Sequence, residues 1–467
     1  MKLVKLSLVA ALAAGAFSVA NATPLDEAIK DVDLSGALRY RYNSGRMTEH
    51  NHADLFNGAG GQGLRKQTHQ FVAKLGFQAA IADNFKAFVE LAYNGGHEPG
   101  FDYNNRTPGA NTTQGLGANT TQGLNVRQYY LTYTADAVDT SVLLGKMQIE
   151  SIWTTNFLGL VGTGAKIINT SLEGTILAAY AFDNFDAFDN GMESDTVTKT
   201  GRFVGAFNGD GLINPKTGAA DRTLVATMNP YESNLYGVAG IGSYDLGFGQ
   251  LNSQLWLAYL TDTAFLYAID LGFKTTFAND LAWKLNLGYL GNAVENDFED
   301  LLGPNSNIAT NGNFVGLNGT LEYMGFDASL GGFYYGDKEQ FSLTTLEDNG
   351  NIAHLLAGQE IYYTNGSNLT GDIGQNTFGF IKAGYTFNEI LRLGVDLVYG
   401  GTKIGDNAVY DVNAGAGDKF EVVARADYKY SPKLNFQAWY SYVDIDAKQN
   451  KNDNAKHSVR LQALYKF

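Results

Sequence analysis

Apolar and polar side chains alternate with a period of two along most of this chain. The last residues have an apolar face that consists of Val459, Leu461, Ala463, Tyr465 and Phe467. The same alternation recurs in stretches such as 33–42 and 419–428. A period of two is typical of β-strands with one apolar and one polar face, so the pattern predicts an all-β protein.

The connections between the predicted strands are of two kinds. Tight turns that hold Gly, Asn, Asp or Pro are at 82–84, 246–249, 277–280, 324–325, 388–389 and 431–433. Longer connections are at 44–66, 95–123, 149–164, 184–232, 292–312, 337–375, 401–417 and 445–455. The two kinds alternate, with 261–263 as a short exception. This predicts an up-and-down sheet of about 18 strands with its tight turns at one end.

Two closed-sheet architectures fit this alternation. A soluble sandwich or propeller turns its apolar faces inward against another sheet, whereas an outer-membrane barrel turns them outward against lipid. The predicted strands have about 10 residues, which is the length that crosses a bilayer at a tilt. Their polar faces carry more charges than a dry core tolerates, and aromatic residues gather near strand ends as they do in interfacial girdles. We therefore expect a transmembrane antiparallel up-and-down β-barrel with short periplasmic turns and long extracellular loops.

Composition agrees with a barrel and excludes several kinds of chemistry. The chain has 13% aromatic residues, 55 glycines and 7 prolines, and all the prolines fall outside the predicted strands. The absence of cysteine excludes disulfides, thiolate nucleophiles and Cys-ligated metals. The net charge of −15 argues against nucleic acid as a partner. The chain contains no run of about 18 apolar residues, the length that would predict a transmembrane helix.

The first 22 residues have the pattern of a secretory signal peptide. Lys2 and Lys5 precede a mostly apolar run, and Ala20-Asn21-Ala22 is an A-x-A cleavage site. We expect a signal peptide at 1–22 and one barrel domain at 23–467, exported to the outer membrane of a Gram-negative bacterium.

Several stretches of the chain resemble one known family. They include AIKDVDLSGALRYRY at 28–42, RQYYLTYT at 127–134, YKYSPKLNFQAWYSYV at 428–443 and VRLQALYKF at 459–467. In these stretches the chain resembles the major outer membrane protein of campylobacters and their relatives, a family of general porins. The resemblance implies an 18-stranded barrel, assembly as a homotrimer, passive passage of small hydrophilic solutes and a role as a surface antigen.

One long connection, 147–164, is unusually apolar. Its apolar residues are Ile149, Ile152, Trp153, Phe157, Leu158, Leu160 and Val161. Because apolar surface is normally covered, we expect this loop to fold inward against the barrel wall and to constrict the bore. The alternative is a loop that caps the rim or contacts another subunit. Glu150 is the acid that we expect to face the passage.

Charged side chains at inward positions of the strands are the other candidates for the pore lining. They are Arg39, Arg41, Lys86, Glu90, Arg127, Arg392, Asp396, Arg425, Asp427 and Arg460. Arginines on one side and acids on the other would set a transverse field that penalises apolar solutes. The alternative is that these side chains solvate the lumen or pair with neighbours across strands. The alternation is ambiguous over 124–135, which includes Arg127.

No arrangement of residues predicts an enzyme or a cofactor. Gly58-x-Gly60-x-x-Gly63 matches a dinucleotide fingerprint, but it follows no buried parallel strand and opens no helix. Six scattered histidines and no thiol provide no catalytic triad. The acidic run 183–195 is a candidate for a weakly bound Ca²⁺, although it lacks the regular spacing of a calcium loop.

These patterns predict a general diffusion porin with weak cation selectivity. A surface adhesin or structural barrel with a plugged lumen is the alternative, and a substrate-specific channel is a third hypothesis. The expected partners are membrane lipid, lipopolysaccharide, small hydrophilic solutes, ions, and host surface molecules that bind the loops. The octapeptide GANTTQGL stands twice in 109–124, and we expect it in a solvated surface loop that tolerates added length.

Overall fold

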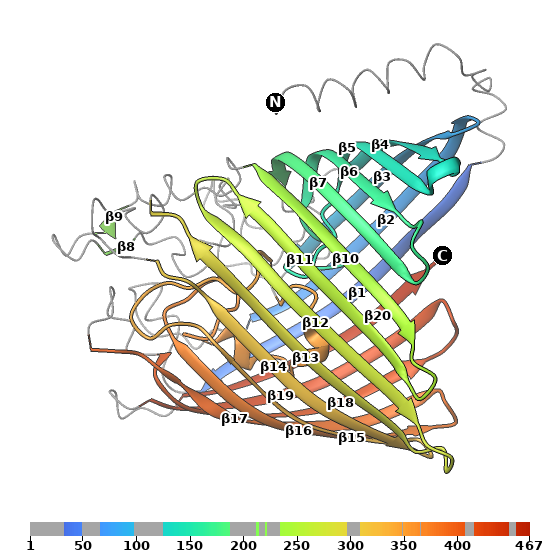
Figure 1. Cartoon of the computed structure of the whole chain (residues 1–467). Helices are drawn as coiled ribbons and strands as arrows, with labels where there is room; N and C mark the ends of the chain where they lie inside the picture. Colours follow the sequence, from blue (N-terminus) through green and yellow to red (C-terminus); the bar gives the residue numbers. More distant parts are fainter. Residues whose placement is uncertain are drawn as a thin grey trace, which may run out of the picture.

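Consecutive strands of the barrel wall pair side by side, and the first strand also pairs with the last (Figure 1). The result is a closed barrel of 18 antiparallel strands. The computed structural model describes residues 32–48, 66–97, 125–186, 212–213, 220–221, 234–296, 309–347, 349–364, 366–406, 415–447 and 454–467. The expected signal peptide and the duplicated octapeptide lie outside these ranges.

The barrel strands follow the alternation that the sequence shows. They are β1 (Asp33–Thr48), β2 (Lys66–Ala82), β3 (Phe85–His97), β4 (Asn125–Ala135), β5 (Thr140–Gln148), β6 (Val161–Asn169), β7 (Thr175–Asp186), β10 (Leu235–Asp245), β11 (Gln250–Leu260), β12 (Ala264–Thr276), β13 (Ala282–Val294), β14 (Asn313–Tyr323), β15 (Phe326–Tyr335), β16 (Gln375–Phe387), β17 (Leu391–Lys403), β18 (Gly417–Lys429), β19 (Leu434–Ala447) and β20 (Asn454–Lys466). A separate two-stranded pair, β8 (Leu212–Ile213) and β9 (Ala220–Asp221), falls between β7 and β10.

The barrel is closed at the two ends of the chain. Leu38 of β1 lies opposite Ala73 of β2 on one side and opposite Tyr465 of β20 on the other. The backbone N–H groups of Gly36 and Phe467 each donate to the other residue's carbonyl, at 3.0 and 3.1 Å. Because both edges of the sheet are paired, the barrel has no open edge where another strand could add.

The tight turns lie at one end of the barrel and the long connections at the other (Figure 1). At two of the tight turns, Met324-Gly325 and Asn388-Glu389, both residues have positive φ. This is the conformation of the two-residue hairpin turns whose twist matches that of the flanking strands. The predicted barrel, its 18 strands and the placement of its short turns are therefore confirmed.

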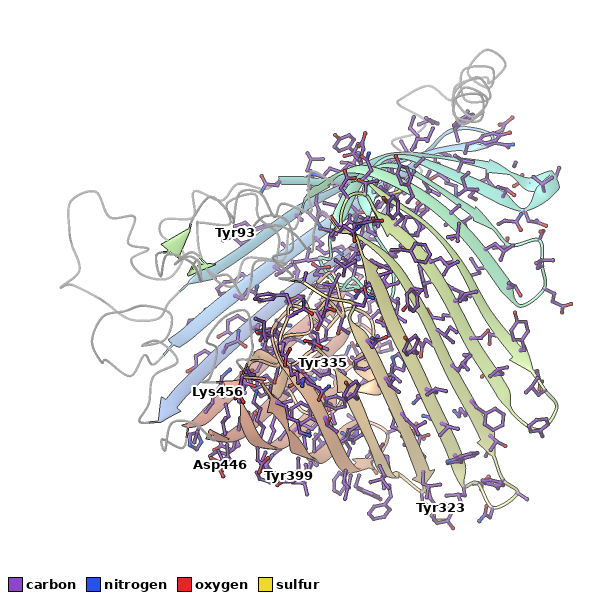
Figure 2. The ribbon with its side chains drawn as sticks, turned by 60° about the vertical axis from the view of Figure 1, so that its left-hand side comes forward. Tyr93, Tyr323, Tyr335, Tyr399, Asp446 and Lys456 are labelled. Atoms are coloured by element: carbon purple, nitrogen blue, oxygen red, sulfur yellow. The ribbon has the colours of Figure 1, made fainter. Side chains whose placement is uncertain are left out.

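The two faces of the wall differ in polarity. Leu393, Leu461 and Tyr399 lie on the outer face, with 45%, 46% and 63% of their surface exposed. Tyr399 and Tyr323 lie on the outside of the wall, whereas Tyr335 lies within the barrel (Figure 2). An apolar outer band with aromatic residues near the strand ends is typical of a barrel that faces lipid.

The largest cluster of buried apolar side chains lies inside the barrel. It joins inward residues of the wall strands to two connections that fold into the lumen, 149–160 and 336–374. Two short 3-10 helices, η4 (Ala353–Leu355) and η5 (Ile361–Tyr363), belong to the second of these connections. Within the described residues, no helix has the length and apolar character needed to cross a membrane.

Candidate channel constriction

The connection between β5 and β6, here called the first inner segment (149–160), is folded tightly on itself. The Thr154 hydroxyl donates to the carbonyl of Ile149 at 2.6 Å and accepts from the N–H of Ser151 at 3.1 Å. Ile152 and Trp153, between these residues, are 1% and 2% exposed. The hydroxyl therefore satisfies the turn's backbone while the apolar side chains pack into the barrel.

Arg127 of β4 ties the first inner segment to the wall. Glu90 lies opposite Gln128 and Leu91 opposite Val126, so Arg127 is the additional residue of a β-bulge. The bulge allows the adjacent Arg127 and Gln128 both to be buried. The Arg127 guanidinium donates to Glu90 at 2.6 Å and to the carbonyl of Gly159 at 2.7 Å.

The tip of the first inner segment docks on β1, β2 and β3. The Phe157 ring lies 4.6 Å from the Arg39 guanidinium carbon and 5.2 Å from the Lys74 ammonium. These distances are within the range of cation–π contacts. The next residue, Leu158, is fully buried in a small cluster with Val72. Two cations and one apolar contact thus hold the tip against the wall.

A second inner segment (336–374), between β15 and β16, covers another part of the lumen. The buried carboxylate of Glu421 on β18 accepts backbone N–H groups from Gln359 and Glu360 at 2.9 Å and from Ile361 at 3.1 Å. Gly358 has a φ of +88°, and a Cβ added there would lie 2.3 Å from a Glu421 oxygen. Only glycine fits this close approach of the backbone to the wall carboxylate.

Side chains of other strands hold the second inner segment at further points. His354 Nε2 lies 2.9 Å from Asp270 of β12, and Asn318 of β14 donates to the His354 carbonyl at 2.8 Å. Lys456 of β20 forms an ion pair with Glu360. The segment is therefore attached to strands that are far apart around the barrel.

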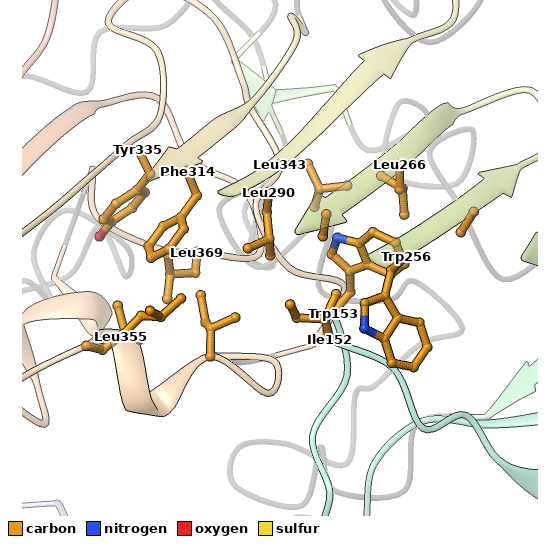
Figure 3. Close-up of a cluster of buried hydrophobic side chains, with 14 of the residues drawn as sticks. Ile152, Trp153, Trp256, Leu266, Leu290, Phe314, Tyr335, Leu343, Leu355 and Leu369 are labelled. Atoms are coloured by element: carbon orange, nitrogen blue, oxygen red, sulfur yellow. The ribbon is translucent and has the colours of Figure 1, made fainter. Parts of the chain in front are cut away.

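The two inner segments contact each other directly. The N–H of Leu346 donates to the Trp153 carbonyl at 2.9 Å. The Glu347 carboxylate accepts the N–H groups of Thr155 at 3.0 Å and Leu160 at 2.9 Å. Trp153 also packs edge-on against Trp256 of β11, with ring centroids 6.3 Å apart (Figure 3). One carboxylate of the second segment thus orders the backbone of the first.

Some of the sequence-predicted pore residues lie beside these segments. Arg39 and Arg127 contact the first segment directly, and Glu90 supports Arg127. Asp396 forms an ion pair with Arg425 and accepts the N–H of Gly358 in the second segment at 3.3 Å.

Glu150, the second residue of the first segment, pairs with Lys166 of β6 at 2.8 Å. Its side chain is 65% exposed.

The remaining predicted residues lie elsewhere on the inward face. Arg41 donates to Gln462 at 2.8 Å, and Arg460 donates to Asn43 at 2.6 Å. Arg392 binds Asp327 through two nitrogens, and Asp427 accepts from Gln437 at 2.9 Å. Lys86 is exposed near the tight turn that precedes β3. Arg127, Arg392 and Arg425 each have a carboxylate partner on their own part of the wall, so these charges are paired locally. A role for any of these residues at the narrowest point stays a prediction.

Sequence reasoning did not identify the second inner segment. The alternation predicts 337–375 only as a long connection, although this stretch has the same apolar character as 147–164 through Ile352, Leu355, Ile361 and Ile373. All four are fully buried. Glu347 and Glu421 were also missed, because nothing in their local sequence shows that a distant backbone segment will supply their hydrogen bonds.

The described residues contain no group of three or more His, Cys, Asp or Glu side chains that could hold a metal ion. Most of the acidic run 183–195, the candidate calcium site, lies outside the described residues. Weak calcium binding there stays a prediction.

Comparison with known proteins gives one family and one fold. The profile of a family described as Campylobacter major outer membrane protein matches residues 1–467. None of the curated proteins compared with the chain matches it.

Three solved structures share the fold at a low level of sequence identity. Pseudomonas aeruginosa OccD3 (OpdP) is 12% identical over 93% of this chain and 91% of that one, with a TM-score of 0.58. A BenF-like porin from Pseudomonas fluorescens Pf-5 is 13% identical over 93% and 99%, also with 0.58. Acinetobacter baumannii OccAB3 is 14% identical over 93% and 99%, again with 0.58.

Proposed function

Because the chain belongs to the Campylobacter major outer membrane protein family, we propose that it is a general diffusion porin whose bore is narrowed by the two inner segments. The family and the barrel make it a porin of the outer membrane, which supports passage of solutes as its activity. The observation that carries the proposal is the junction at Trp153 and Glu347, where the two segments meet inside the barrel.

The proposed mechanism is passive diffusion through the remaining aqueous space. Charged side chains at inward positions, including Arg39, Glu90, Arg127 and Glu150, attract water and ions and disfavour apolar solutes. The fields of such groups are strongest where the water layer is thinnest. The net charge of −15 supports a weak preference for cations.

The proposal extends to the partners that the family resemblance implies. The channel assembles as a homotrimer in lipid and lipopolysaccharide, and its extracellular loops are antigenic and bind host surface molecules. A weakly held Ca²⁺ in the acidic run 183–195 is also part of the proposal. Crosslinking of the detergent-solubilised protein tests the trimer, and a band at the monomer mass alone would contradict it.

A planar-bilayer recording in asymmetric KCl tests the channel. We expect discrete, stable conductance steps and a reversal potential displaced toward that of K⁺. A plugged structural barrel or adhesin is the second candidate, because apolar side chains of both segments fill part of the lumen. Pure, folded protein that leaves the bilayer silent would favour that candidate.

A further inference from the structure

A cavity of about 240 Å³ lies between the first inner segment and the wall strands β2 to β6. Its apolar floor includes Phe88 of β3 and Tyr130 of β4, whose ring centroids are 4.9 Å apart. The volume is below the roughly 300–1,000 Å³ of pockets for drug-sized ligands. At roughly 30 Å³ for each water molecule, it is large enough for a solute of several polar groups rather than a single ion.

One end of the cavity is cationic. Lys74 of β2 lines it, whereas the Glu90 carboxylate, 3.4 Å from the Lys74 ammonium, does not. Glu90 is instead held by Arg127 at 2.6 Å and by the Gln128 amide at 3.1 Å. The charge that this end presents to a solute is therefore the Lys74 ammonium.

The opposite end presents a carboxylate. Glu150 and Lys166 both line it and are 2.8 Å apart, but the Glu150 side chain is 65% exposed and that of Lys166 only 13%. The more accessible charge at this end is therefore negative. Since three strands separate β2 from β6, the two charges stand at opposite ends of the aromatic floor.

This arrangement is complementary to a molecule with a carboxylate at one end, an ammonium at the other and an apolar body between them. We propose that the cavity is a transient binding site for zwitterionic dipeptides. The carboxylate terminus binds Lys74, the amino terminus binds Glu150, and an apolar side chain packs on Phe88 and Tyr130. The inference rests on the proposed channel function, and binding must be weak because a conducting site has to release its solute.

Single-channel recording with a matched set of solutes tests the dipeptide class. Glycyl-phenylalanine is compared with its N-acetyl derivative, which lacks the ammonium, and with its C-terminal amide, which lacks the carboxylate. We expect the parent dipeptide to interrupt the current at concentrations at least 10-fold lower than either derivative. Equal block by the acetylated compound would overturn the zwitterion assignment, and so would an open channel that no dipeptide interrupts.

Variants of the Glu150–Lys166 pair test the site itself. Glu150→Gln should weaken the block about 10-fold, whereas Lys166→Met should strengthen it, because Glu150 then loses its competing cation. Glu322→Gln is the control: Glu322 also pairs with an inward lysine, Lys284, but it does not line the cavity. The dipeptide should block the Glu322→Gln channel at the same concentration as the wild type.

If Glu150→Gln and Lys166→Met both weakened or both strengthened the block by the dipeptide, the result would contradict the site. General damage to the segment would change the block in the same direction in both variants. A wild-type bilayer without any conductance would refute the channel, and this site with it. Normal conductance without block refutes the site alone.

Discussion

At the scale of single residues, a few buried charges determine where the inner segments lie. Arg127 satisfies Glu90 and the carbonyl of Gly159 together. Whereas Arg127 donates to backbone, the Glu421 carboxylate accepts three backbone N–H groups of 359–361. Hydrogen bonds with an ionised partner are shorter and stronger than neutral ones. Each of these side chains therefore fixes a stretch of backbone that would otherwise be free to move.

Arg127→Met should destabilise the barrel and loosen the first inner segment. The substitution leaves the buried Glu90 carboxylate without its closest cation, and breaking a buried ion pair costs about 3–5 kcal/mol. We expect a value near the lower limit, because Lys74 remains 3.4 Å from Glu90. Urea unfolding in detergent measures the loss, and conductance noise should rise. Lys86→Met, at an exposed position, should change stability by less than about 0.5 kcal/mol.

Asp372 of the second inner segment should make stability depend on pH. Burial raises the pKa of its carboxyl to about 6, although N–H groups such as that of Ile373 oppose the shift. The folded pKa is above the unfolded one, so the favourable contribution is complete below pH 4 and is lost as the pH rises through 6. At pH 7 the penalty is about 3 kcal/mol, from roughly two pKa units at 1.4 kcal/mol each.

Asp372→Asn should therefore stabilise the protein at pH 7 and have little effect at pH 4, as measured by tryptophan fluorescence during unfolding. Asp262→Asn, at an exposed turn position, is the control for loss of a carboxylate and should change the free energy of unfolding by less than about 0.5 kcal/mol. An equal effect of Asp372→Asn at pH 4 and pH 7 would show that its carboxyl is not linked to folding.

At the scale of elements, the two inner segments act as one unit. Six hydrogen bonds cross between them. The donors are the backbone N–H groups of Leu346, Glu347, Asn351, Thr155 and Leu160 and the side-chain amide of Asn156. Among their described residues, the longest helices are the three-residue η4 and η5, which are too short to be stable alone. Each therefore depends on the other and on the wall for its backbone partners.

Glu347→Ala should uncouple the two segments. It removes the acceptor of the Thr155 and Leu160 N–H groups, and a buried donor left without a partner costs about 1–3 kcal/mol. We expect larger and noisier conductance steps and faster cleavage within 149–160 by added protease. Glu339→Ala, which removes a partly exposed partner of Lys338 in the same segment, should cost about 0–1 kcal/mol. Identical traces from both variants would rule out a coupling role for Glu347.

At the scale of the whole molecule, barrel closure and the outward apolar face explain how the chain crosses a membrane. Every wall strand has two hydrogen-bonded neighbours, so no backbone group of the sheet needs a partner from lipid. Side chains such as Leu393 and Leu461 cover the outer surface, while the ion pairs lie inside. The alternation of residues thus places apolar side chains toward lipid and charged side chains toward the lumen.

The depth of an outer-face position in the membrane should determine how much an added charge there lowers the free energy of unfolding. Leu461→Arg, in the middle of β20, should reduce stability in bilayers by about 2–4 kcal/mol, and Leu34→Arg, at the end of β1, by only about 0–1 kcal/mol. Both leucines are about half exposed in the barrel, at 46% and 55%. Unfolding in lipid vesicles measures the difference. Equal costs at the two sites would argue against a lipid-facing wall.

The sequence alone determined the wall of this protein. A period of two reports which face each residue of a strand occupies, and turn residues mark where strands reverse, so Leu461 and Met324-Gly325 could be placed without coordinates. The apolar content of 147–164 likewise predicted a covered loop, because that inference needs only composition. These are local properties, and each can be read within about a dozen residues.

Only the tertiary structure determined which residues hold the two inner segments inside the barrel. The bulge that turns Arg127 inward depends on how β3 aligns with β4, and the ambiguous alternation over 124–135 does not specify that register. Glu347 meets Leu160 across 187 positions of the chain, and Glu421 meets Gln359 across 62. Such contacts form when barrel closure brings distant backbone to a buried charge. The alternation along the chain is a local pattern and therefore cannot predict them.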